Sequence, residues 1–112
     1  MSNLKGLIEI EIGGKKRSLK FGTNQTALFC EITGLPLSES FNVKNFKAGE
    51  LRDFIFSALK DGCRIKSEKV DFTNVDVGDW MDELSQQDYG LIFGTAFNQL
   101  PKEEKKTEIT NP

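Results

Sequence analysis

Alternating apolar and charged residues at the start of the chain predict a β-hairpin. Between Gly6 and Ile12, isoleucines alternate with Glu9 and Glu11, which is the period of a strand with one buried face. A second run extends from Lys15 to Phe21, and the Gly13-Gly14 pair between the runs favours a two-residue turn with positive φ angles. This turn sets the register, in which the apolar face consists of Ile8, Ile10, Ile12, Leu19 and Phe21.

The other face of the hairpin is predicted to be polar and exposed. It consists of Glu9, Glu11, Lys16, Ser18 and Lys20. The register places Glu11 opposite Lys16, where the two charges can pair across the strands. Because a two-stranded hairpin is marginally stable on its own, other elements must cover its apolar face.

Helical spacing of apolar residues predicts a first helix that Thr23 or Asn24 caps and that runs to about Thr33. Gly34 and Pro36 follow this helix and favour its termination. Its apolar positions are Ala27, Leu28 and Ile32, with Phe29 as a further candidate. The stretch from Leu37 to Lys47 has no clear period, and we interpret it as a short helical turn followed by a loop that its aromatic residues anchor.

The clearest helical pattern lies between Ala48 and Asp61, and we expect this helix to be central to the core. Its apolar residues recur three and four positions apart, and Gly62 is a candidate for its C-terminal cap. These residues are Leu51, Phe54, Ile55, Ala58 and Leu59. A polar connection from Lys66 to Asn74 leads to a shorter helix, opened by Asn74 or Asp76 and carrying Val77, Trp80, Met81 and Leu84.

A last helix is predicted between a capping box, Ser85 to Asp88, and Pro101. One side of this helix carries Tyr89, Ile92, Phe93, Ala96, Phe97 and Leu100. Gly90 and Gly94 lie on the same helix, where each costs about 1 kcal/mol relative to alanine. We therefore expect a close packing contact that compensates for these glycines.

The composition indicates one globular domain, residues 1–100, followed by a charged tail, residues 101–112, without an apolar stripe. Hydrophobic residues make up 38% of the 112 residues, which is enough for a single small core. Together with the order of the elements, this predicts an α+β fold in which an N-terminal β-hairpin packs on a bundle of about four helices.

Charge and hydropathy argue against nucleic acid and membranes as partners. Fifteen Lys and Arg against seventeen Asp and Glu give a net charge of -2, so no positive field attracts polyanions. The apolar runs are too short to span a bilayer, and the N-terminus lacks the pattern of a signal peptide. We therefore expect a cytoplasmic protein that binds neither nucleic acid nor membrane.

Sequence motifs give no candidate for a catalytic, cofactor or metal site. The chain has no histidine, and Cys30 and Cys63 lack the spacing of metal ligands or of a disulfide framework, so we interpret both as free thiols. The acidic residues from Asp76 to Glu83 are typical of a helix start. The stretch from Gly13 to Lys16 lacks the spacing of a phosphate-binding loop. We predict a non-catalytic protein without cofactor or metal.

Aromatic side chains are the main candidates for a binding surface. The loop and helix phenylalanines of so small a domain cannot easily all be internal, so some are expected to form a patch for a partner or for self-association. Trp80 and Tyr89 can act as interface anchors, but their helical spacing with other apolar residues favours core packing. The predicted contact residues are Phe41, Phe46, Trp80, Phe93 and Phe97.

Several stretches of the sequence resemble the tail assembly chaperones of long-tailed bacteriophages, prophages and gene-transfer agents. The first is the hairpin from Gly6 to Phe21, and the second is the stretch from Thr26 to Leu37, which contains the motif Glu31-Ile32-Thr33-Gly34. The third is the core helix from Leu51 to Leu59. A later helix with an acidic, tryptophan-containing start, here Val77 to Trp80, is also similar. The resemblance covers about residues 6–100 and involves packing motifs without an active site.

This resemblance implies a chaperone that binds the phage tape-measure protein, keeps its long apolar helices soluble and helps to deliver the tail-tube protein. Such chaperones often have a short form and a frameshifted long form, which the charged tail after Pro101 would suit. An alternative is a structural tail or head-tail connector protein, retained in the virion and forming homo-oligomers through hairpin edges. A small enzyme or ligand-binding domain is a third hypothesis, which a deep polar pocket would favour.

Overall fold

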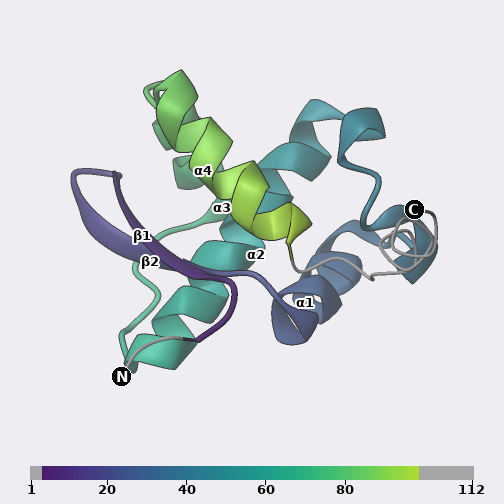
Figure 1. Ribbon diagram of the computed structural model, residues 1–112, viewed down its shortest axis with the longest axis horizontal. Helices are drawn as coiled ribbons and strands as arrows, with labels where there is room; N and C mark the ends of the chain where they lie inside the picture. The colour runs from purple at the N-terminus through teal and green to yellow at the C-terminus, as the bar shows by residue number, and fades with distance from the viewer. Residues whose placement is uncertain (1–3, 99–112) are drawn as a thin grey trace, which may run out of the picture.

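The computed structural model describes residues 4–98, which form an α+β fold (Figure 1). The elements in chain order are β1 Leu7–Ile12, β2 Lys15–Lys20, α1 Thr23–Thr33, the 3₁₀ turns η1 Leu37–Glu39 and η2 Val43–Asn45, α2 Ala48–Lys66, α3 Asn74–Met81 and α4 Gln86–Phe97. The antiparallel hairpin packs against the four α-helices, which confirms the predicted fold class. The predicted end of the last helix at Leu100 and Pro101 and the tail 101–112 lie outside the described residues.

The hairpin has the predicted register. Ile12 pairs with Lys15 across the turn and Ile8 pairs with Leu19, while Gly13 and Gly14 have φ angles of 67° and 86°. Such angles suit glycine because its missing Cβ removes the steric penalty of a positive φ. The apolar face is covered as expected, and Ile10, Ile12, Leu19 and Phe21 are all buried.

The polar face of the hairpin differs from the prediction at Ser18, which is buried. The cause is α2, which crosses β2 so closely that a Cβ at Gly62 would overlap the backbone carbonyl of Ser18. Gly62 was predicted to cap the helix, but it lies inside α2, which continues to Lys66. The glycine is needed for close approach, and the helix instead ends at Ser67 with a left-handed φ of 57°.

Helix α1 buries a different face from the predicted one. Its buried side chains are Gln25 and Phe29, whereas Ala27 and Ile32 are exposed. Gln25 is buried because its amide donates to the Ser57 hydroxyl of α2 at 3.0 Å, which satisfies a polar group inside the core. The helix starts after Gly22, one residue earlier than expected.

Helix α2 runs through the middle of the molecule, as Figure 1 shows, and carries the predicted core face. Phe54, Ile55, Ala58 and Leu59 are buried, and Leu51 is half-buried. The connection after α2 is less polar than expected, because it buries Phe72 among other aromatic rings at centroid distances of 5.5 to 5.9 Å.

Side-chain caps open the last two helices. Thr73 and Asp76 bond reciprocally at the start of α3, so the cap is Thr73 and neither Asn74 nor Asp76. The Ser85 hydroxyl accepts from the Asp88 N–H at 3.0 Å at the start of α4, as predicted. None of the helices in residues 4–98 has the length and hydrophobicity that a membrane crossing requires.

The predicted close contact at the glycines of α4 is wrong. A Cβ at Gly90 or Gly94 would meet no atom of the described residues within 4 Å, so this side of α4 faces open space. The buried side chains of α4 are instead Ile92 and Ala96, on the face that packs on the core.

Candidate protein-binding surface

Phe46, one of the five predicted contact residues, is packed against the core. Its ring centroid lies 5.2 Å from that of Phe29 and 5.5 Å from that of Phe54. The turn η2 holds it there, since the Phe46 N–H donates to the carbonyl of Val43 at 3.1 Å. Phe46 therefore anchors the loop between α1 and α2, as expected for an aromatic residue of this loop.

Trp80 fastens the tip of the hairpin to α3. Its indole lies against Gly13, where a Cβ atom would come within 2.5 Å of the ring. The guanidinium carbon of Arg17 lies 4.4 Å from the Trp80 ring centroid and 5.3 Å from that of Phe72, within the range of cation–π contacts. Much of the indole is therefore in contact with other residues of the protein.

Arg17 also joins the hairpin to the connection before α3. It donates to the backbone carbonyl of Ile12 at 2.9 Å and to the carboxylate of Asp71 at 3.2 Å. The hydrogen bond from Arg17 holds the pKa of Asp71 below its usual value, although partial desolvation opposes this effect. The Lys15 ammonium lies 3.9 Å from the same carboxylate.

Phe93 and Phe97 belong to a row of rings along α4. Tyr89 and Phe93 are stacked with centroids 6.2 Å apart, and Phe93 and Phe97 follow at 6.4 Å. The Tyr89 hydroxyl donates to the carbonyl of Met81 at 2.7 Å, and burial raises its pKa. The first two rings are half-buried, whereas Phe97 is 48% exposed, so the row ends at the surface.

Phe41 borders an apolar groove beside α1, which we call the α1 groove. The groove has a volume of about 380 Å³, and its lining includes Thr26, Ala27, Cys30, Leu37 and Phe41. Phe41 also borders a small hollow next to Ala96. Its ring therefore lies between α1 and the last turn of α4.

The turn η1 forms one wall of the α1 groove. Gly34 ends α1 with a left-handed φ of 79°, and the extended Pro36 leads into η1. The buried hydroxyl of Ser40 donates to the carbonyl of Leu37 at 2.7 Å and closes the turn. This hydrogen bond fixes the backbone that presents Leu37 and Phe41 to the groove.

The α1 groove contains apolar residues that the core does not use. Leu37 is 61% exposed, and Cys30 is half-buried. Sequence reasoning missed Ala27, Cys30 and Leu37 as site residues, because it assigned Ala27 to the core face of α1. The sequence did indicate such a surface. The apolar residues of α1 occupy more than one side of the helix, and one packing contact cannot bury them all.

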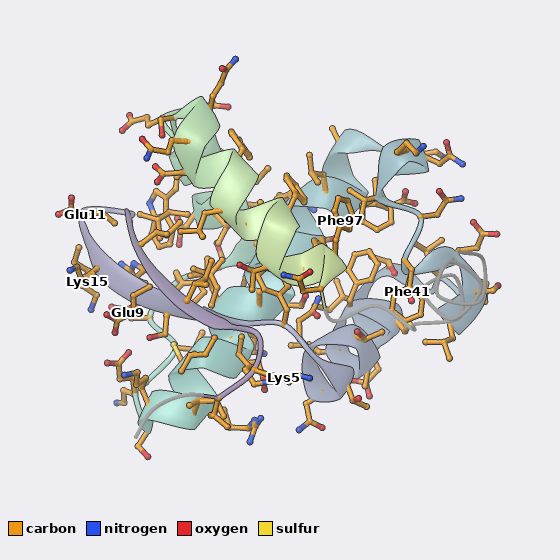
Figure 2. All side chains as sticks on the ribbon, in the orientation of Figure 1. Lys5, Glu9, Glu11, Lys15, Phe41 and Phe97 are labelled. Atoms are coloured by element: carbon orange, nitrogen blue, oxygen red, sulfur yellow. The ribbon has the colours of Figure 1, made fainter. Side chains whose placement is uncertain are left out.

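Phe41 and Phe97 lie at one end of the molecule. Figure 2 shows both on the same side, away from Glu11 and Lys15 at the tip of the hairpin. Of the other predicted contact residues, Trp80 packs at the hairpin, and Phe46 is partly buried against the core.

Metal-ligating side chains and thiols are the remaining chemical groups of interest in the described residues. In residues 4–98, no group of three or more His, Cys, Asp or Glu side chains is placed to hold a metal ion. Cys63 is buried, and desolvation raises the pKa of its thiol, so the reactive thiolate is disfavoured. Cys30 is also a free thiol, and it borders the α1 groove.

Comparisons of the chain with protein-family models, with curated proteins and with solved structures give no significant match. The geometry of the surface and the sequence resemblance are therefore the basis for assigning a function.

Proposed function

We propose that this protein is a phage tail assembly chaperone that binds the tape-measure protein through the α1 groove and does not act as an enzyme. The resemblance of its packing motifs to that family supports the role. The α1 groove supports the mode of binding, because a groove with apolar walls suits the apolar face of a helix.

The observation that carries this proposal is the uncovered apolar surface at one end of the molecule. It consists of the α1 groove, and Phe97, which is 48% exposed, lies on the same side of the molecule as Phe41 (Figure 2). Fully burying one leucine-sized side chain contributes about 1.5–3 kcal/mol, so a few such contacts give useful affinity. A tape-measure helix would gain cover for its apolar face, and the charged remainder of the chaperone would keep the complex in solution.

Co-expression with the tape-measure protein of the same phage or prophage tests this proposal. The full chain should increase the soluble fraction of the tape-measure protein. Leu37→Glu should abolish this gain, because it places a charge in the apolar groove. The variant should still fold, since Leu37 is 61% exposed.

Val75→Glu is the matched control for this experiment. Val75 is also 61% exposed, but it lies on α3 outside the α1 groove. This variant should solubilise the tape-measure protein as well as the natural chain does. Equal loss in both variants, or no gain with the natural chain, would contradict the proposal.

A structural tail or head-tail connector protein is the second candidate, and an open strand edge favours it. Within residues 4–98, the outer edge of β1 has no partner strand, and such edges can join neighbouring subunits. Mass spectrometry of purified virions separates the two roles. A chaperone should be absent from mature particles, whereas a connector should be present in stoichiometric amounts.

A further inference from the structure

Helix α2 covers one edge of the hairpin, and within residues 4–98 the other edge, that of β1, has no partner strand. Residues in a two-residue hairpin alternate between pairs that exchange hydrogen bonds and pairs whose N–H and C=O groups point outward. The bond from the Phe21 N–H to the Gly6 carbonyl at 2.8 Å fixes this alternation, and it places Ile8, Ile10 and Ile12 in the bonded pairs. Glu9 and Glu11 therefore point their backbone groups away from β2.

Among the described residues, α2 covers the β2 edge, whereas β1 has a smaller contact with α4. Ser18, which pairs with Glu9, has its carbonyl against Gly62 of α2, which leaves no space for another strand there. On the β1 edge, Glu9 and Glu11 are exposed, and within residues 4–98 no backbone bond to their outward groups is present. An exposed row of this kind is a template for an added strand.

A groove of about 590 Å³ borders the end of this free edge. It lies between the hairpin tip and the C-terminal part of α3, and its lining includes the side chains of Glu11, Asp79, Trp80 and Glu83. Within the described residues none of these three carboxylates is in an ion pair. Two cations lie close to the groove: Lys16 is opposite Glu11, and Arg17 lies over the Trp80 ring but is paired with Asp71. Three carboxylates against these two cations leave an excess of negative charge.

We propose that the free edge of β1 binds an extended, Lys- or Arg-bearing segment of a partner protein as a third strand. The backbone of this segment would bond to the outward N–H and C=O groups of Glu9 and Glu11. One of its cationic side chains would lie in the groove, where the carboxylates of Glu11, Asp79 and Glu83 attract a cation. This surface lies at the hairpin, so the inference is independent of the α1 groove.

A second copy of this chain is a poorer occupant. Antiparallel pairing of two β1 strands would place the glutamates of one copy beside those of the other, and like charges at such positions are destabilising. The β2 strand, which carries lysines, is excluded as the incoming strand because α2 covers its edge. The charge pattern therefore selects a basic segment from another protein.

Titration of the full chain with a short peptide of alternating lysine and valine, followed by NMR, tests this inference. The Glu9 and Glu11 amides should shift and become protected from hydrogen exchange. A peptide N-methylated on one edge cannot donate backbone hydrogen bonds there. It should bind at least about tenfold more weakly, because each lost bond contributes about 1 kcal/mol and 1.4 kcal/mol is tenfold in affinity.

Charge variants of the protein complete the test. Glu83→Lys should weaken binding of the lysine peptide, whereas Glu31→Lys, at an exposed position on α1, should leave it unchanged. Equal binding of the N-methylated peptide would show attraction by charge alone and would overturn the proposal. Absence of binding, shifts confined to other elements, or dimerisation of the chain through β1 would overturn it as well.

Discussion

Gly62 is the residue on which the contact between α2 and β2 depends. A Cβ at this position would overlap the Ser18 carbonyl, and neither backbone can move away without disturbing the core. We expect Gly62→Ala to destabilise the protein by roughly 1–3 kcal/mol or more, the usual range for overpacking. Urea unfolding measures this change.

Gly94 provides the control for Gly62 in a second helix. A Cβ at Gly94 meets open space within the described residues, so Gly94→Ala should stabilise the protein by about 1 kcal/mol through helix propensity alone. Similar effects of the two alanines would contradict the close contact between α2 and β2.

Asp71 gives the stability a dependence on acid pH. The hydrogen bond from Arg17 lowers its pKa in the folded protein below the unfolded value of about 3.9. The group therefore stabilises the fold above the unfolded pKa, and this contribution disappears as the pH falls through the folded pKa.

The variant Asp71→Asn measures this contribution. We expect it to be less stable than the natural chain at neutral pH, and the difference should shrink below about pH 4. Thermal unfolding of both proteins at a series of pH values measures this difference in stability. A difference that stays constant as the pH falls would exclude Asp71 as its source.

At the scale of elements, α1 is joined to α2 by a buried polar contact. The Gln25 amide donates to the Ser57 hydroxyl, which itself donates to the carbonyl of Phe54 at 2.7 Å. Ser57→Ala should cost about 1–3 kcal/mol, because it leaves the Gln25 amide buried without this partner.

Replacing both groups separates this cause from a simple loss of packing. The double variant Gln25→Met with Ser57→Ala should recover part of the stability lost in Ser57→Ala, because it also removes the buried amide. Urea unfolding of the two variants and the natural chain gives the comparison. A double variant less stable than the single one would contradict the role of the hydrogen bond.

The elements differ in how well the sequence predicted them. The hairpin register and the core face of α2 followed from the sequence. A two-residue glycine turn allows one register, and the apolar stripe of α2 identifies the face that is buried. The face of α1 was wrong, since Gln25 is buried through a hydrogen bond with Ser57, a residue distant in the sequence. Gly62 was misassigned because the sequence alone does not distinguish a glycine that caps a helix from a glycine that lets two backbones pack closely.

The candidate site was predicted only in part. The number of aromatic residues indicated an exposed patch, and Phe41 and Phe97 lie on the same side of the molecule, away from the hairpin tip. Leu37 was missed because its exposure depends on the η1 turn, which the Ser40 hydroxyl closes. The helical spacing of Trp80 favoured packing over a binding role, but its partners Gly13 and Arg17 became visible only when the fold brought these elements together.

At the scale of the whole molecule, two different surfaces lie on either side of one core. The α1 groove and Phe97 form an apolar surface suited to a helix, whereas the free β1 edge and its acidic groove suit an extended basic segment. A chaperone with both surfaces can hold an apolar helix and contact a second partner at the same time. Our central proposal concerns the α1 groove, through which we propose that this protein covers apolar helices of a tape-measure protein.

Alkylation of Cys30 in the complex tests this claim most directly. Cys30 is a half-buried thiol that borders the α1 groove, whereas Cys63 is buried and serves as an internal reference. Mass spectrometry after timed treatment with iodoacetamide follows both residues in the free chain and in the co-purified complex with the tape-measure protein. We predict that Cys30 reacts much more slowly in the complex while Cys63 is unchanged. Equal rates for Cys30 in the free and bound chain would contradict the account.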